Sequence, residues 1–254
     1  MEKKLIPVLT IAAILTILVG GIVNSAFKEG KFTCNRYILN TYLYVSLAII
    51  FISLILSILR YHNVFLFEKY KERLGLLFIL LFIGTIATII GMRFVSPQRV
   101  LLKHFLWLTF VALIALSFHP IHYMYGKAGL DKLINSAFLT TLILVLALTA
   151  FAFYKPELIS LSWGPILFFL LLAAIVMELI IYFIKGYTPS NLHRGMSYII
   201  IGIFIGYLLY DTKLLQIRAK LCTKETADYL KESLNIFLDI WNLFIRILSV
   251  SNRK

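Results

Sequence analysis

Charged residues are scarce in this sequence, and acidic residues are scarcer than basic ones. Only 15% of the 254 residues are charged and 61% are hydrophobic, with 12 Asp and Glu against 25 Lys and Arg. A soluble domain of this composition would have too little polar surface to cover itself, so we expect a lipid bilayer as the main solvent. The deficit of charge therefore excludes a soluble globular domain as the body of the protein.

Cysteine is equally scarce, because the chain contains only Cys34 and Cys222. Neither has a second Cys or a His at the spacing of a zinc site, and two cysteines do not make the disulfide framework of a small secreted domain. The sequence also lacks Asn-x-Ser and Asn-x-Thr acceptors, so glycosylation places no loop in a lumen. These two absences leave the compartment open.

Long apolar runs fill most of the chain. A helix needs roughly 20 mostly apolar residues to cross the hydrocarbon layer, and runs of about that length alternate here with short charged linkers. The runs are too long for strands and lack the alternation of a β-barrel, so we predict an all-α membrane protein. The predicted spans are residues 5–27, 37–59, 74–92, 105–125, 133–154, 158–184, 195–210 and 233–250.

Residues 1–36 are predicted to form an N-terminal hydrophobic segment, followed by a seven-span domain over residues 37–254. The basic start and the small residues Ser25 and Ala26 also fit a signal peptide or a signal anchor. The run 5–27 is long for the apolar core of a signal peptide, which favours a retained additional span.

The excess of positive charge does not indicate a nucleic-acid partner. The net charge is +13, but Lys and Arg stand singly or in small groups at the ends of the spans, where they anchor helices at anionic lipid headgroups. Lys and Arg are also evenly divided between the two sides of the predicted topology. The positive-inside rule therefore gives no orientation.

Ionisable residues inside the predicted spans are few. Such a group is costly in a span and usually faces a partner or a water-filled cavity, so each one marks a candidate site. Glu178 has no charged residue within one helical turn, and it either pairs across helices or faces the cavity. The residues are Arg93, just after the third span, and Glu178, Asp211, Asp239 and Arg246.

The last predicted span carries a polar stripe. Asn235, Asp239, Asn242 and Arg246 recur at steps of four, three and four residues, so they share one helix face. That face cannot meet lipid, which places the last span near the centre of the bundle. The asparagines and Arg246 are cavity candidates, although a hydrogen-bonded seam that only holds helices together is an alternative.

Asp211 follows directly on the run 195–210, and its position has two interpretations. It either closes that span as a functional group or begins the polar loop, since Lys213 comes soon after. The sequence around the two aspartates bears on this choice. Two segments resemble the transmembrane Bax inhibitor motif family, also called the lifeguard family. Tyr210-Asp211-Thr212 is similar to the end of its sixth span, and FLDIWNLFIRIL, residues 237–248, is similar to its seventh span.

The resemblance to this family extends towards the N-terminus. Residues 136–154 and 162–167 are similar to its fourth and fifth spans, and residues 97–120 to its second loop and third span. The resemblance implies a seven-helix Bax-inhibitor-type bundle with the last helix central, to which the N-terminal hydrophobic helix is an addition. Lys213 departs from the family pattern, which usually has Gln there, and would change the charge at a pore mouth.

The resemblance also implies a function. Asp211 and Asp239 would form the paired-aspartate site of a pH-sensitive Ca²⁺ leak channel that modulates Ca²⁺ homeostasis and cell death, and Arg93 is the candidate for an arginine latch. The family topology puts the loop between the last two spans in the cytosol. Cys34 and Cys222 would then lie on that reducing side, so both are predicted to be free thiols.

Elementary electrostatics agrees with the implied role of the aspartates. Two carboxyl groups close together in a low-dielectric site cannot both ionise easily, so they share a proton or bind a cation. Carboxylate oxygens suit hard cations such as Ca²⁺, which is expected as the transported ion rather than as a cofactor. No cofactor is expected.

Two other function classes remain alternatives. A non-conducting membrane adaptor would bind other membrane proteins of cell-death or Ca²⁺ signalling. An intramembrane aspartyl protease is more remote, because Leu238-Asp239-Ile240 lacks the Gly-x-Gly-Asp context and no Pro-Ala-Leu segment follows. We therefore predict a protein that is not an enzyme. Its expected location is the endoplasmic reticulum or another endomembrane if it is eukaryotic or viral, and the plasma membrane if it is bacterial.

Overall fold

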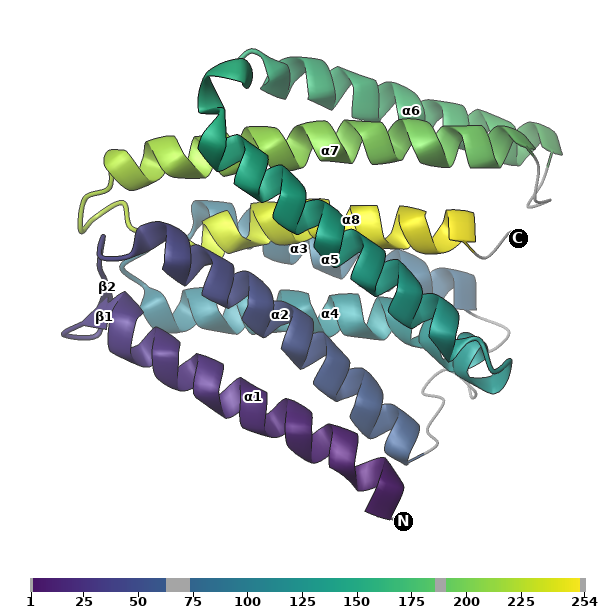
Figure 1. Cartoon of the computed structure of the whole chain (residues 1–254), viewed down its shortest axis with the longest axis horizontal. Helices are drawn as coiled ribbons and strands as arrows, with labels where there is room; N and C mark the ends of the chain where they lie inside the picture. The colour runs from purple at the N-terminus through teal and green to yellow at the C-terminus, as the bar shows by residue number, and fades with distance from the viewer. Residues whose placement is uncertain (1, 63–73, 186–190, 252–254) are drawn as a thin grey trace. The chain divides into compact units, whose positions relative to one another are not determined.

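The computed structural model describes residues 2–62, 74–185 and 191–251, and most of these residues are helical (Figure 1). A short antiparallel hairpin, β1 (Phe27–Lys28) and β2 (Lys31–Phe32), joins the first two helices, and a 3₁₀ turn (Pro156–Leu158) precedes the sixth. The helices are α1 (Glu2–Ala26), α2 (Tyr37–Tyr61), α3 (Leu74–Phe94), α4 (Val100–Lys127), α5 (Asp131–Tyr154), α6 (Trp163–Lys185), α7 (Asn191–Lys220) and α8 (Tyr229–Ser251).

The predicted all-α fold is confirmed. Within the described residues, seven helices, α2 to α8, are long and apolar enough to cross a membrane. Helix α1 has 25 residues. The helix predicted near the N-terminus is therefore present, and its role as an additional span stays a prediction.

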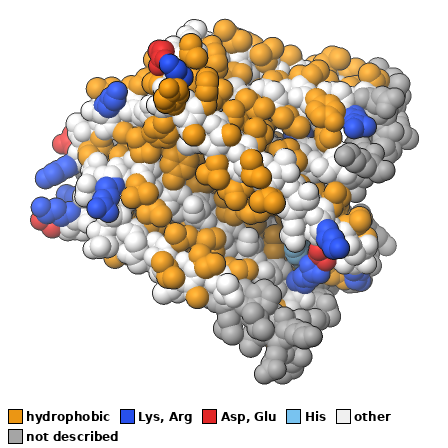
Figure 2. Space-filling model, viewed as in Figure 1, with side chains coloured by type: hydrophobic (Ala, Val, Ile, Leu, Met, Phe, Trp, Pro, Cys, Tyr) orange, Lys and Arg blue, Asp and Glu red, His pale blue; other side chains and the backbone are white. Residues whose placement is uncertain are grey.

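Large hydrophobic side chains are exposed along these helices. Phe82, Phe169 and Phe183 are 65%, 66% and 80% exposed, and hydrophobic side chains predominate on the face shown in Figure 2. Water would disfavour so much exposed apolar surface, whereas lipid accommodates it. The protein is therefore an integral multi-pass membrane protein.

The chain forms two compact units. Unit 1 comprises Met1–Gly129 and Ala219–Leu234, and unit 2 comprises Leu130–Arg218 and Asn235–Lys254. Helix α8 thus contributes its first turns to unit 1 and the rest of its length to unit 2.

In unit 1, α1 packs against α2, and both α2 and α3 pack against α4. The hairpin that joins α1 to α2 turns at Glu29 and Gly30, which have φ values of 56° and 73°. Two successive positive φ angles are typical of a type I′ turn, which favours Gly at its second position. The sequence analysis missed this hairpin, although the Glu29-Gly30 pair between Lys28 and Lys31 carried its signal.

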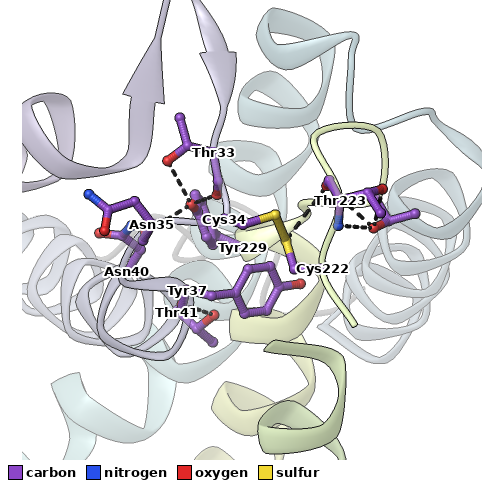
Figure 3. Close-up of a disulfide and its surroundings, with 10 residues drawn as sticks. Thr33, Cys34, Asn35, Tyr37, Asn40, Thr41, Cys222, Thr223 and Tyr229 are labelled. Atoms are coloured by element: carbon purple, nitrogen blue, oxygen red, sulfur yellow. Dashed lines mark hydrogen bonds between the residues drawn. A yellow bond between two sulfur atoms is a disulfide. The ribbon is translucent and has the colours of Figure 1, made fainter. Parts of the chain in front are cut away.

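A disulfide links Cys34 to Cys222, with Cα atoms 5.7 Å apart (Figure 3). Cys34 follows β2, and Cys222 lies in the loop between α7 and α8, so the hairpin brings together residues separated by 188 positions. The hydroxyl of Tyr229 donates to the backbone oxygen of Thr33 beside this bond. The prediction that both thiols are free was wrong.

Helices α4 and α7 extend beyond the predicted spans 105–125 and 195–210. Helix α4 begins at Val100 and continues through Pro120 to Lys127. Helix α7 continues past Asp211 to Lys220, because residues 211–220 contain neither Gly nor Pro.

In unit 2, α6 and α7 approach each other at glycines. A Cβ atom placed on Gly206 of α7 would lie 2.7 Å from a methyl group of Leu167 on α6, and one on Gly164 would lie 2.7 Å from the Tyr210 hydroxyl. Small residues allow such close approach between membrane helices. The amide of Gln216 also donates to the backbone oxygen of Ala152 in α5 (3.0 Å).

Candidate ion site

Asp211 lies inside α7 and is partly buried. The expectation that it ends its span was wrong. The alternative that Asp211 begins a polar loop rested on Lys213, but the ammonium group of Lys213 donates to the backbone oxygen of Ile159, ahead of α6. The lysine is therefore hydrogen-bonded within unit 2. Asp211 itself lies about 13 Å from the end of α7, at a rise of 1.5 Å per residue.

Asp239 lies in α8 and is 5% exposed. Its carboxyl group is hydrogen-bonded to the side chain of Asp211 and interacts electrostatically with it. The structure therefore brings together the two aspartates that the sequence analysis singled out. Tyr207, one turn before Asp211 on α7, is close enough to interact electrostatically with both carboxyl groups.

Helix geometry explains why the two carboxyl groups meet. Asp239 lies about 15 Å from the start of α8 at Tyr229, and Asp211 lies about 13 Å from the end of α7. The two helices are consecutive and are joined by a short loop. Their similar distances from that loop put both aspartates at similar positions along the two helices, away from the helix ends.

One oxygen of the pair lacks a partner. The Oδ2 atom of Asp239 is buried, and no donor among the described residues reaches it. A buried carboxylate oxygen without a hydrogen bond is costly unless it is protonated or meets a cation. Asp239 is therefore the residue of the site at which a proton or a cation is most needed.

The carboxyl pair is a minimal ligand set. No group of three or more His, Cys, Asp or Glu residues able to hold a metal ion occurs in the described part of the chain. Tight Ca²⁺ sites supply six to eight oxygen ligands, so two carboxyl groups suit brief cation contact rather than storage. Their other chemical capacity is to share one proton.

The other residues that the sequence suggested for a latch or cavity lie in different surroundings. Asn242 donates to the backbone oxygen of Leu238 within α8 (2.8 Å), whereas Asn235 is partly buried. Arg246 pairs across helices with Glu178 of α6, which answers the question that the sequence left open for Glu178. The latch candidate Arg93 is exposed in the last turn of α3, and its role stays a prediction.

Unit 1 contains a buried ion pair that was not predicted from the sequence. Lys103 of α4 donates to a carboxylate oxygen of Asp228 and to the backbone oxygen of Met92 (2.9 Å). The lysine and aspartate side chains are 1% and 7% exposed. Asp228 also accepts from the backbone N–H of Lys231 (3.1 Å), which caps α8. An aspartate just before an apolar run was a recognisable capping signal, but nothing in the sequence pointed to Lys103.

Comparison with known proteins finds a family model that matches most of the chain and relatives that match about half of it. The model of the Bax1-I family, described as inhibitor of apoptosis-promoting Bax1, matches residues 34–253. A BI1-like protein of Arabidopsis thaliana is 34% identical over 124 residues, which are 47% of this chain and 44% of the relative. Bax inhibitor 1 of Schizosaccharomyces pombe is 33% identical over 121 residues, covering 47% and 42%.

A third relative has the same extent of similarity. Protein LIFEGUARD 4 of Arabidopsis thaliana is 32% identical over 123 residues, which are 47% of this chain and 46% of the relative. The chain thus matches less than half the length of each of these curated relatives. The match to the family model is longer and includes both aspartates and the cysteines.

Proposed function

The chain belongs to the Bax inhibitor family, and we propose that it is a pH-sensitive Ca²⁺ leak channel whose paired-aspartate site is Asp211 and Asp239. The observation that carries the proposal is the contact between these two carboxyl groups inside the spans, where Asp239 has a buried oxygen without a hydrogen-bond partner among the described residues. Ionisable groups at such positions in membrane proteins commonly mark ion or proton paths.

The chemistry of the pair supplies the pH sensitivity. A proton held between the two carboxyl groups joins α7 to α8 by a hydrogen bond. Loss of this proton leaves two negative charges in a site of low dielectric constant, and they either separate the helices or take up a cation. Because the proton belongs to the pair, both aspartates are needed for the response.

A flux assay on the purified protein in liposomes tests this function. We expect Ca²⁺ flux to depend on pH in the parent, and Asp211→Asn and Asp239→Asn each to flatten that dependence. Asn keeps the shape and a hydrogen bond but removes the shared titration. The double variant should lie within about twofold of either single variant, because the two residues act as one unit.

Glu157→Gln is a matched control. It removes a carboxylate from the same unit, but Glu157 is exposed and its partner Lys155 is 3.8 Å away, so the pH profile should not change. If both aspartate variants fold and keep the parent's profile, the paired-aspartate mechanism is wrong.

A second candidate function is a non-conducting membrane adaptor. The family description, inhibitor of apoptosis-promoting Bax1, refers to an effect on another protein and favours this class. We propose for either function a modulatory role in cell death. A folded parent protein that passes no Ca²⁺ in liposomes at any pH would favour the adaptor.

A further inference from the structure

Glu178 and Arg246 form an ion pair in unit 2, separate from the two aspartates. One guanidinium nitrogen of Arg246 donates to Glu178 Oε2 at 2.8 Å, and the other donates to Oε1. This two-fold arrangement fixes the geometry of both side chains. The pair joins α6 to α8 in the second half of each helix, with Glu178 seven residues and Arg246 five residues before the helix end.

The pair is not sealed in the protein interior. The side chains of Arg246 and Glu178 are 26% and 29% exposed, whereas Asp239 is 5% exposed. Charged groups within a span avoid lipid and face other protein or water. Each side chain of the pair therefore keeps part of its surface outside the protein interior.

Arg246 shares a helix face with Asp239. The two residues are seven positions apart on α8, which is two turns and about 10 Å along the axis. A lone positive charge at that distance on the same face would repel any cation that approaches Asp239. For a divalent ion in a medium of effective dielectric constant about 20, the repulsion corresponds to a change of at least tenfold in occupancy.

We propose that Glu178 is a selectivity-determining residue, which pairs with Arg246 and thereby removes a positive charge from the approach to the paired aspartates. This inference rests on the proposed leak function, and it adds a residue that the family resemblance did not assign to conduction. Arg246 on this view is tolerated in the span because its charge is compensated.

The alternative is a purely structural pair that holds α6 against α8. The two views predict opposite changes in cation flux for the variant Arg246→Gln. If the pair is structural, Glu178→Gln and Arg246→Gln both break it and both lower flux. If charge matters, Glu178→Gln exposes a positive charge and lowers cation flux, whereas Arg246→Gln leaves a carboxylate and raises it.

The experiment measures Ca²⁺ and K⁺ flux in liposomes for the full chain, Glu178→Gln, Arg246→Gln and the double variant. We expect Glu178→Gln to lower Ca²⁺ flux about tenfold and K⁺ flux about threefold, because the repulsion scales with ion charge. Arg246→Gln should raise Ca²⁺ flux, and the double variant should return close to the parent. Glu157→Gln should match the parent throughout.

Two results would overturn the inference. One is an equal fall in flux for both single variants, and the other is an equal effect on Ca²⁺ and K⁺. If Glu178→Gln fails to fold, Arg246→Gln still tests the inference. The charge effect predicts a higher Ca²⁺ flux for this variant, whereas a purely structural pair predicts a lower one. Including Asp239→Asn separates the two proposals. If the parent passes no Ca²⁺, or if Asp239→Asn keeps the parent's pH profile, the proposed leak function is wrong. If only the results for Glu178 and Arg246 contradict expectation, the leak function still holds and the charge-pair inference is wrong.

Discussion

Unit 1 and unit 2 both have charged side chains in or next to apolar helices, but these side chains are bonded differently in the two units. In unit 1, Lys103 and Asp228 are almost inaccessible and share their hydrogen bonds with the backbone of Met92 and Lys231. In unit 2, one oxygen of Asp239 has no partner within the described residues, and the Glu178–Arg246 pair is partly exposed.

This difference teaches where function can reside. A fully bonded buried network stabilises one conformation and has no capacity for a ligand, whereas an incompletely bonded one needs a proton, an ion or water. Unit 1 adds a disulfide and a cluster of rings that includes Tyr44, His104 and Tyr229. We therefore interpret unit 1 as the more rigid scaffold and unit 2 as the responsive part.

The largest expected effect comes from breaking the ion pair of unit 1. Lys103→Met leaves the buried carboxylate of Asp228 without its partner, and such changes cost about 3–5 kcal/mol of unfolding free energy. Denaturant unfolding in detergent measures the loss. Adding Asp228→Asn should recover part of it, because Asn removes the charge and still caps α8.

The matched control for this pair is Lys155→Met in unit 2. Lys155 is exposed and lies 3.8 Å from Glu157, so its loss should change stability by no more than about 0.5 kcal/mol. Equal losses for Lys103→Met and Lys155→Met would show that unit 1 does not depend on its buried pair.

Removing the disulfide should have the next largest effect. Cys34→Ser or Cys222→Ser opens a link across 188 positions and should cost about 2–4 kcal/mol in unfolding free energy. The double variant should equal either single variant, since one bond is lost in all three. A double variant that is clearly less stable than both would contradict this account.

The same disulfide predicts the orientation of unit 1. Disulfides persist in oxidising compartments, so the segment around Cys34 and the loop around Cys222 should face the oxidising side of the membrane. After mild reduction of sealed vesicles, an impermeant thiol reagent should label both cysteines from that side. Labelling from the reducing side only would restore the cytosolic placement expected from the family resemblance.

A smaller effect should arise at the glycines of α7 in unit 2. Gly206→Ala places a methyl group against Leu167, and the adjustment should cost about 1 kcal/mol. Gly202→Ala is the control, because its Cβ would meet nothing within 4 Å and should be neutral or slightly stabilising. If the two variants unfold alike, the close α6–α7 contact is not a constraint in unit 2.

The apolar pattern alone predicted the spans and singled out Asp239, whereas the pairing of Asp239 with Asp211 was implied by the family resemblance. Lipid requires long apolar runs, and it makes a lone charge such as Asp239 conspicuous. Asp211 was predicted to lie at the end of its helix because Lys213 looked like a loop residue. Lys213 instead lies in α7 and donates to the backbone oxygen of Ile159, just before α6. Lys103 pairs with a residue 125 positions away, a contact that no local pattern specifies.

The smallest expected effect is a gain of stability at the hairpin of unit 1. Glu29 has a φ of 56° and precedes Gly30 in the turn, a conformation in which Asn is much better tolerated than Glu. Asn-Gly is also the preferred pair of a type I′ turn. Glu29→Asn should therefore raise the unfolding free energy by about 0.5 kcal/mol.

Glu29→Ala separates the backbone effect from the charge effect. Both substitutions remove the carboxylate between Lys28 and Lys31, but Ala gains nothing in the left-handed region. Thermal unfolding should rank the variants Asn above Glu, with Ala no better than Glu. An equal gain for Ala would assign the effect to charge. Since Glu29 lies in unit 1, the pH profile of Ca²⁺ flux should be the same in all three proteins, and a shifted profile would contradict the view that the responsive groups belong to unit 2.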